Sequence, residues 1–353
     1  MAILTVADGL PLQTTHEQKD IVWLDAAATR QIKIYGAAET SPCYRRAPAA
    51  LEPLLRPELA KLCSHSSGIR ARFKTNSPYI ALHVQWDDRF LSEVMMRPMR
   101  SFDLFSVHGE KQTFECFFKP PIHATSTQDF VWTSHGDLRE FILNWPLYNR
   151  IFKVYIGLQA GSVLEPGGSY HNELPVVFYG SSITQGAFAS RPGNSYQNFL
   201  SRALNMNYVN LGFSGNCKGD PIMVDYMAQL PMCCFVCDYD HNAPNAEFLK
   251  DTHFEVYRRI REKNPQVPFV MITKPSYKPE DADRRAVIME SYQRALAAGD
   301  RNVYFIDGAA FYAGEERDAC TEDGIHPNDL GLYRMAKGMV ATLRNILYGR
   351  GLY

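Results

Sequence analysis

The sequence predicts a two-domain protein: an all-β domain over residues 1–168 and an α/β domain over residues 169–353. Three observations lead to this fold class. The chain has 353 residues, of which 46% are hydrophobic, and that length suggests two domains rather than one. The first half alternates apolar and polar residues, whereas the second alternates wholly apolar runs with helical stretches. Between them, residues 165–175 ("EPGGSYHNELP") have the glycine and proline content of a domain boundary.

The strands expected in the first half are short and closely spaced. They are "SGIRARFKT" (67–75), "YIALHVQW" (79–86), "SFDLFSVHG" (101–109), "KQTFECFFK" (111–119), "REFILNW" (139–145) and "RIFKVYIGL" (150–158). In residues 67–75 the apolar side chains alternate strictly with basic ones, as in a half-buried strand. This spacing is typical of an antiparallel sandwich or barrel. Residues 48–62 have a helical spacing of leucines, but Pro53 and Pro57 keep any helix there short.

The second half contains five apolar runs that read as buried strands. They are "PVVFYG" (175–180), "NYVNLGF" (207–213), "MCCFVCDY" (232–239), "PFVMITKPS" (268–276) and "VYFIDGAAF" (303–311). Strands that are apolar on both faces and separated by helices predict a five-stranded parallel sheet covered on both sides. The clearest helix is 332–347, where apolar residues recur every three or four positions. Such sheets bind ligands at the carboxyl ends of their strands.

Polar residues follow these strands at the expected places. The first strand ends in Gly180 and is followed by Ser181 and Ser182, and Asp323 stands three residues before His326 ahead of the last helix. A serine, an acid and a histidine in this chain order are the parts of a nucleophilic triad. The G-x-S-x-G elbow of α/β-hydrolases is not met, because Thr184 replaces its second glycine.

These residues resemble the SGNH (GDSL-type) hydrolases. "YGSSITQG" (179–186), "GFSGN" (212–216), the asparagine of "DHN" (240–242) and "DGIHP" (323–327) match four family blocks in order. The resemblance implies a flavodoxin-like hydrolase domain with a five-stranded parallel sheet. It implies the following site residues: Ser182 as nucleophile, His326 as base, Asp323 as its partner, and an oxyanion hole formed by Ser182, Gly215 and Asn242.

Two stretches modify this resemblance. Asp240 and His241 replace the glycines that usually precede the asparagine, and we interpret His241 as a residue that lines the substrate pocket. In the first half, "SFDLF" (101–105) is similar to the GxDLY motif in the amino-terminal domain of some of these esterases. That similarity implies a jelly-roll-like β-sandwich, in which Asp103 reads as an acid of a strand or turn.

The implied activity is hydrolysis of short acyl esters, acetyl esters above all, of a carbohydrate or small glycosylated molecule. A serine hydroxyl must lose its proton to a base as it attacks, and the developing oxyanion needs hydrogen-bond donors aimed at it. This chemistry requires no metal or cofactor. Alternatives are a thioesterase or lysophospholipase-like acyl hydrolase, a flavodoxin-like protein that binds flavin mononucleotide through 181–187, and a non-catalytic carbohydrate-binding protein. Without the other site residues, Ser181 and Ser182 could equally be caps of the helix that follows, with no role in catalysis.

The composition limits the classes of binding partner and the cellular compartments that we expect for this protein. The 37 basic and 38 acidic residues leave a net charge of −1, which gives no footprint for nucleic acid or an anionic membrane. No apolar run approaches the ~18 residues of a membrane span, and no signal peptide is visible, so we expect a cytoplasmic protein, or a secreted or periplasmic one if a signal was removed. Cys234 and Cys237 have the spacing of a zinc half-site, but no second pair matches, which favours buried thiols. The sequence does not indicate an oligomeric state.

Overall fold

A computed structural model describes residues 3–88, 100–120, 125–276 and 278–349. The chain divides into two compact units, each made of more than one segment. The first unit contains Met1–Ala49, Ser64–Ser169 and Arg191–Gly193, and the second contains Ala50–Cys63, Tyr170–Ser190 and Asn194–Tyr353.

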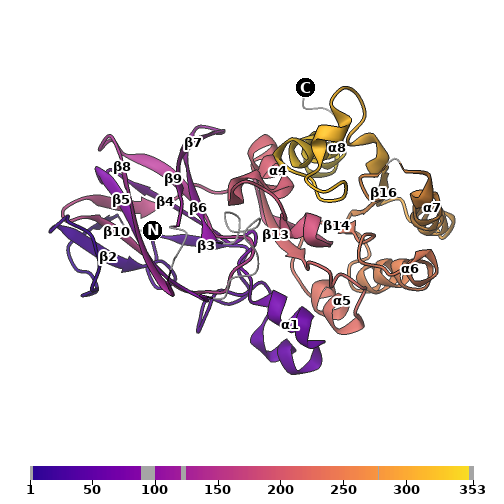
Figure 1. The fold of residues 1–353 in the computed structure, drawn as a ribbon, viewed down its shortest axis with the longest axis horizontal. Coiled ribbons are helices and arrows are strands. Elements are labelled where there is room, and N and C mark those ends of the chain that lie inside the picture. Colours follow the sequence, from indigo (N-terminus) through magenta and orange to yellow (C-terminus); the bar gives the residue numbers. More distant parts are fainter. Residues whose placement is uncertain (1–2, 89–99, 121–124, 277, 350–353) are drawn as a thin grey trace. The chain divides into compact units, whose positions relative to one another are not determined.

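The first unit consists of strands in two antiparallel sheets. Its strands are β1 (Leu4–Thr5), β2 (Ile21–Asp25), β3 (Lys33–Tyr35), β4 (Arg70–Thr75), β5 (Tyr79–Trp86), β6 (Phe102–His108), β7 (Lys111–Phe118), β8 (Thr127–Thr133), β9 (Arg139–Asn144), β10 (Ile151–Gln159) and β11 (Val163–Pro166). One sheet has the order β1-β11-β4-β9-β6-β7, with β3 paired to β4, and the other has the order β2-β10-β5-β8. The labelled strands form the indigo-to-magenta part of Figure 1.

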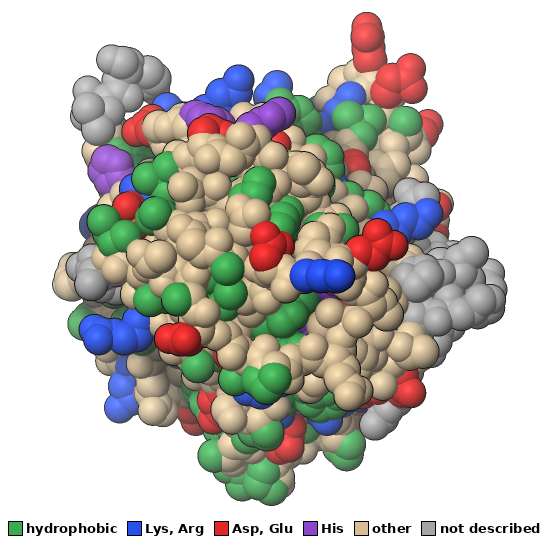
Figure 2. All heavy atoms as spheres, turned by 90° about the vertical axis from the view of Figure 1, so that its left-hand side faces the viewer, with side chains coloured by type: hydrophobic (Ala, Val, Ile, Leu, Met, Phe, Trp, Pro, Cys, Tyr) green, Lys and Arg blue, Asp and Glu red, His purple; other side chains and the backbone are tan. Residues whose placement is uncertain are grey.

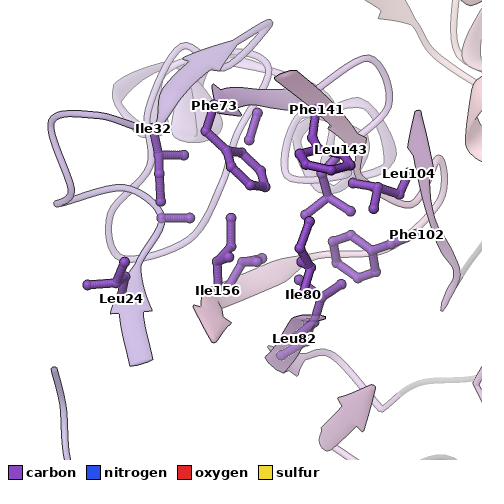
Figure 3. Close-up of a cluster of buried hydrophobic side chains, with 14 of the residues drawn as sticks. Leu24, Ile32, Phe73, Ile80, Leu82, Phe102, Leu104, Phe141, Leu143 and Ile156 are labelled. Atoms are coloured by element: carbon purple, nitrogen blue, oxygen red, sulfur yellow. The ribbon is translucent and has the colours of Figure 1, made fainter. Parts of the chain in front are cut away.

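The core of this unit takes side chains from both sheets, as expected of a sandwich. Phe73, Phe102 and Phe141 come from the larger sheet, and Ile80 and Ile156 come from the smaller one. All five side chains are fully buried, and they lie close together in Figure 3. Each strand presents alternate side chains to one face, so the apolar members of the alternating pattern meet between the two sheets.

The second unit contains one parallel sheet. Its strands are β12 (Asn172–Gly180), β13 (Met206–Gly212), β14 (Cys234–Asp238), β15 (Phe269–Ile272) and β16 (Val303–Ile306). Their order is β13-β12-β14-β15-β16, and every neighbouring pair is parallel. Numbered within this sheet, the order is 2-1-3-4-5, which is the flavodoxin-like order. β13 is added on one side of β12, and β14, β15 and β16 are added on the other, so the order of the strands reverses at β12. Ligand-binding residues are therefore expected at the carboxyl ends of β12, β13 and β14.

Helices pack around this sheet. They are α1 (Pro57–Cys63), α3 (Ser182–Gln185), α4 (Tyr196–Leu204), α5 (Pro221–Ala228), α6 (Ala246–Lys263), α7 (Ala282–Ala297) and α8 (Asp329–Tyr348). Short 3₁₀ turns cover Ala49–Leu54, Pro192–Asn194, Pro279–Asp281, Gly308–Ala310 and Arg317–Cys320. Helix α4 packs against α8, and α6 packs against both α5 and α7. In Figure 1, α4 and α8 lie on one side of the strands and α5 and α6 on the other.

These observations confirm the expected fold class. All six strands expected in the first half are present, and the five apolar runs form the parallel sheet. The prolines break residues 48–62 into a 3₁₀ turn and the short α1. The sequence pattern missed β1, β2, β3, β8 and β11, four of which have five residues or fewer. A strand that short carries too few residues for a period of two to be recognised.

The two units do not correspond to a single division of the chain at residue 168. The main boundary falls after Ser169, but two short segments belong to the other unit. Within the second unit, Arg56 donates hydrogen bonds to the Asp220 carboxylate at 2.7 and 3.1 Å and to the side chain of Asn216 at 2.9 Å. Contacts between residues 160 or more positions apart leave no signal in a local sequence pattern.

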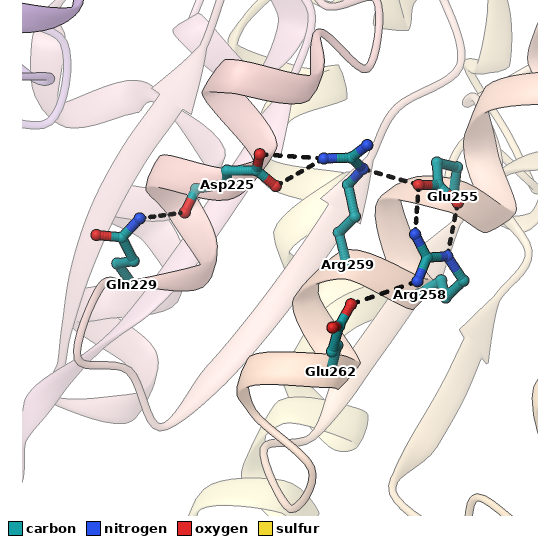
Figure 4. A network of polar contacts seen from close by, with 6 residues as sticks. All are labelled: Asp225, Gln229, Glu255, Arg258, Arg259 and Glu262. Atoms are coloured by element: carbon teal, nitrogen blue, oxygen red, sulfur yellow. Dashed lines mark hydrogen bonds and ion pairs between the residues drawn. The ribbon is translucent and has the colours of Figure 1, made fainter.

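The surface matches the balanced composition. Basic and acidic side chains are interspersed over the face drawn in Figure 2. On the second unit, Arg259 of α6 joins Asp225 of α5 and Glu255 of α6, with nitrogen–oxygen distances of 2.8 to 3.0 Å (Figure 4). Exposed networks of this kind contribute little to stability, roughly 0–1 kcal/mol for each pair, because water screens the charges.

Candidate active site

The two serines after β12 have different surroundings. Ser181 is the N-cap of α3, and its hydroxyl accepts a hydrogen bond from the Ile183 N–H at 3.2 Å. Ser182 is the first residue of the helix, and its Oγ lies 2.9 Å from Nε2 of His326. Helix capping therefore occupies Ser181, while Ser182 contacts a base.

His326 is held between Ser182 and Asp323. Its Nδ1 lies 2.7 Å from one carboxylate oxygen of Asp323. The other oxygen accepts hydrogen bonds from the backbone N–H groups of His326, at 2.7 Å, and Ile325, at 3.0 Å. Because an ionised carboxylate can only accept, Nδ1 carries the proton and Nε2 is the acceptor for the Ser182 hydroxyl. The three side chains thus form a continuous Ser–His–Asp chain of hydrogen bonds.

Asp323 is ionised at neutral pH. Its partial burial raises the pKa. The hydrogen bonds from the backbone and ring of His326 and from the Ile325 backbone lower the pKa by a larger amount, so it lies below its ordinary value. The side chain remains 43% exposed and that of His326 26% exposed, so solutes can reach the site. An ionised partner stabilises a protonated imidazole.

Gly215 and Asn242 follow the two strands that flank β12. Gly215 has φ +68, in the left-handed region that glycine adopts without strain. The side-chain oxygen of Asn242 accepts a hydrogen bond from the Cys217 N–H at 3.2 Å, which joins the loops after β13 and β14. Because that bond uses the oxygen end of the amide, the NH₂ end is left to donate. Gly180 pairs with both Gly212 and Asp238, so all three loops start at one edge of the sheet.

The residues that depart from the family pattern, Asp240 and His241, have partners of their own. Asp240 is buried and accepts hydrogen bonds from Arg284 Nε at 2.7 Å and from the Lys274 N–H at 3.0 Å. Burial lowers the pKa of His241 to about 4, and its Nε2 has no partner among the described residues. His241 is therefore uncharged at neutral pH, and it lines a cleft of about 130 Å³ together with Gly324 and Ile325.

Asp238, the last residue of β14, is a buried carboxyl group that contacts α3, and the sequence did not reveal these contacts. One oxygen of Asp238 accepts hydrogen bonds from the Thr184 hydroxyl at 2.8 Å and the Tyr196 hydroxyl at 3.1 Å. Its other oxygen has no partner in the described part of the chain. The pKa of Asp238 is raised to about 7: burial and, to a smaller extent, the nearby Asp240 raise it, and the two hydrogen bonds from hydroxyl groups lower it.

The loop between α3 and α4 contributes contacts that the sequence did not reveal. The ring of Phe188 lies 5.2 Å from that of His326, centroid to centroid, and its φ of +61 is strained for a bulky residue. Asp329, the first residue of α8, accepts hydrogen bonds from the Ser190 N–H at 2.8 Å and from the Asn194 amide at 2.7 Å. These bonds tie the loop that carries Phe188 to the start of the helix that follows His326.

In the first unit, Asp103 of the GxDLY-like stretch is fully buried and well bonded. Its carboxylate accepts hydrogen bonds from the Asn144 amide at 2.8 Å and from the Gly193 N–H at 2.7 Å, and it pairs with Arg191 at 3.2 Å. It is thus an acid on strand β6, as the sequence indicated. It holds residues 191–193 within that unit, a role that its position in the sequence gave no reason to expect.

The described ranges contain neither a candidate metal centre nor a membrane-spanning helix. Cys234 and Cys237 lie on β14 as buried thiols, and no three histidine, cysteine or acidic side chains there are grouped as metal ligands would be. None of the helices described has both the length and the apolar character needed to cross a bilayer.

Comparison with known proteins identifies two domains. Residues 173–344 match the model of the GDSL-like lipase/acylhydrolase family, and residues 21–164 match that of GxDLY, the amino-terminal domain of SGNH-type esterases. No curated protein sequence matches the chain.

Several solved structures are similar over both domains. A Bacteroides ovatus protein described as a GDSL-like lipase has a TM-score of 0.83 at 28% identity, covering 93% of this chain and 98% of that chain. The salicylyl-acyltransferase SsfX3 of a tetracycline biosynthetic pathway has a TM-score of 0.75 at 18% identity, with coverages of 93% and 98%. The acetyl xylan esterase Est2A of the rumen bacterium Butyrivibrio proteoclasticus has a TM-score of 0.63 at 13% identity, with coverages of 94% and 100%. From the two domain matches and the first of these structures, the chain belongs to the GDSL-like (SGNH-type) hydrolases and carries an amino-terminal domain of the GxDLY type.

Proposed function

We propose that this hydrolase is a serine esterase that cleaves short acyl esters, acetyl esters above all, of a carbohydrate or small glycosylated molecule. The observation that carries the proposal is the continuous bond chain from Ser182 through His326 to Asp323, at 2.9 and 2.7 Å. A serine within hydrogen-bond reach of an imidazole that a carboxylate orients is the arrangement that activates a hydroxyl at neutral pH.

The reaction proceeds in two halves. His326 Nε2 takes the proton from Ser182 Oγ as that oxygen attacks the ester carbonyl, and the same nitrogen then gives the proton to the leaving alcohol. Water next attacks the acyl-serine and gives a proton to His326; the bond to Ser182 Oγ then breaks, Oγ takes that proton back from His326, and the carboxylic acid leaves. The N–H groups of Ser182 and Gly215 and the amide of Asn242 stabilise the oxyanion in both halves.

The choice of a short acyl group rests on the names of proteins with related folds. A long acyl chain would require an apolar groove in which to bury its methylene groups, at about 0.8 kcal/mol each. Related folds include proteins named as an acetyl xylan esterase and as carbohydrate esterases, which supports the same choice.

An acyl-chain series tests this specificity. Aryl esters of two to twelve carbons should give the highest kcat/KM at two to four carbons, because a longer acyl chain gains binding energy only where an apolar groove buries its methylene groups. The matched control is the same series without enzyme, which removes differences in intrinsic reactivity. A preference for eight or more carbons would favour a lysophospholipase-like enzyme, and faster cleavage of the matching thioesters would favour a thioesterase.

The oxyanion role of Asn242 gives a second expected result. Replacing Asn242 with alanine should lower kcat by about 10²- to 10³-fold, the usual loss of one such donor. Asn242→Asp is the matched variant, because it keeps the acceptor for the Cys217 N–H but removes the donor. Asn242→Asp should lose at least as much activity as Asn242→Ala, because its carboxylate also repels the oxyanion, while it unfolds near the wild-type denaturant concentration. Turnover within threefold of wild type in both would remove Asn242 from the oxyanion hole.

A further inference from the structure

The cleft beside the triad has walls that belong to the proposed catalytic loops. Gly324 and Ile325 lie between Asp323 and His326 in the chain, and His241 directly precedes Asn242. The rest of the lining comes mostly from residues after β15, including Lys274 and Lys278. All of these residues lie in the second unit. The cleft is therefore lined by chain neighbours of the base and of a proposed oxyanion donor, and Ser182, His326 and Asn242 are not among its lining residues.

Its position selects one half of the ester. The leaving oxygen must come within about 3 Å of His326 Nε2 to receive its proton. The group attached to that oxygen therefore lies on the imidazole side, where Gly324 and Ile325 form the wall. The cleft is thus placed for the alcohol half of the substrate rather than the acyl half.

Two charged side chains in the cleft are free to bind a ligand. The Lys274 ammonium is paired with Asp281 at 2.5 Å, which neutralises both. The side chains of Lys278 and Glu280 are exposed, and the structure gives neither a partner among the described residues. One is a donor of three hydrogen bonds and the other is an acceptor. An anion would be repelled by Glu280 and a cation by Lys278, whereas neutral hydroxyl groups can bind to both.

The remaining wall is apolar and the space is small. Ile325 is 53% exposed although it is a large hydrophobic residue. The cleft volume of about 130 Å³ is close to the roughly 150 Å³ of a cavity that holds one benzene ring. Free donors and acceptors, one apolar wall and space for one six-membered ring match a single sugar ring, which has hydroxyl groups at its edge and C–H groups on its faces.

We propose that this cleft binds the alcohol half of the substrate as one neutral sugar ring, with Lys278 and Glu280 bonded to its hydroxyl groups and Ile325 against its C–H face. The inference rests on the proposed esterase function and adds the place where the leaving group binds and the residues that contact it. Lys278, Glu280 and Ile325 determine specificity in this account and take no part in proton transfer.

The test compares two acetyl esters that differ only in the alcohol: methyl 6-O-acetyl-glucopyranoside and ethyl acetate. Lys278→Ala and Glu280→Gln should each lower the ratio of kcat/KM for the glycoside to that for ethyl acetate by about tenfold or more, mainly through KM. Lys278→Arg should restore part of the ratio. The matched controls are Lys263→Ala and Glu247→Gln, exposed positions on α6 outside the cleft, which should leave both rates unchanged.

Each outcome separates the two proposals. If the wild type cleaves both esters and the ratio stays constant in Lys278→Ala and Glu280→Gln, the cleft does not bind the sugar. Cleavage of ethyl acetate without cleavage of the glycoside overturns the sugar class but leaves the esterase. If the wild type cleaves neither of these esters nor any other acyl ester, the proposed function is wrong, and this inference, which rests on it, is wrong as well.

Discussion

Replacing Ser182 with alanine should lower kcat for an aryl acetate on the order of 10⁴- to 10⁶-fold, because it removes the oxygen that we propose to form the acyl intermediate. Ser182 Oγ lies 2.9 Å from the base, and alanine leaves that nitrogen without its proton donor. The residual rate comes from binding and the oxyanion donors alone. Release of the aryl alcohol at saturating substrate measures this loss.

Ser181→Ala is the matched control, since it removes an identical hydroxyl one position away. Its hydroxyl only caps α3, so the expected cost is about 0.5–2 kcal/mol of stability and a much smaller change in kcat. If Ser181→Ala abolishes turnover while Ser182→Ala keeps it, the roles of the two serines are reversed and the contact with His326 is incidental.

Replacing Asp238 with asparagine changes the free energy of unfolding more favourably at pH 8 than at pH 5, by roughly 2–3 kcal/mol. Burial raises the pKa of this carboxyl from 3.8 to about 7. The folded chain therefore holds the proton more tightly than the unfolded chain, and stability is lost as the pH rises from about 4 through about 7. Asparagine is never ionised and can still accept from Thr184 and Tyr196.

Denaturant unfolding of both proteins at several pH values measures the effect. Burial lowers the pKa of His241 and His253 to about 4, so these two histidines add stability as the pH rises through the same range. They contribute equally to wild type and variant, and the difference between the two curves isolates Asp238. A difference that stays constant from pH 5 to pH 8 would show that Asp238 is ionised at low cost in the folded protein.

The sequence was most informative where local composition decides structure. Parallel strands buried on both faces must be apolar throughout, so the runs at 175–180 and 232–239 marked β12 and β14 directly. The pair Asp323 and His326 could be recognised because its three-residue spacing lies within one loop. An acceptor and a donor that are so near in the chain can be paired without knowledge of the fold.

The features that the sequence missed all depend on tertiary contacts. Asp238 is a polar residue at the end of an apolar run, and only the fold places Thr184 and Tyr196 on it. Phe188 adopts a positive φ although no glycine marks the turn. Residues 50–63 belong to the second unit through Arg56, whose partners lie 160 or more positions away. A local pattern cannot report such distances.

The most direct test of the account is covalent labelling of the folded wild-type protein with a fluorophosphonate, followed by peptide mapping. The reagent reacts with a serine only where a base removes its proton, so it reports nucleophile activation without any assumption about the substrate. We expect a single adduct on the peptide containing Ser182, no adduct in Ser182→Ala, and strongly slowed labelling in His326→Ala. An adduct on another serine, or labelling at an undiminished rate in His326→Ala, would contradict the assignment of Ser182 as the nucleophile activated by His326.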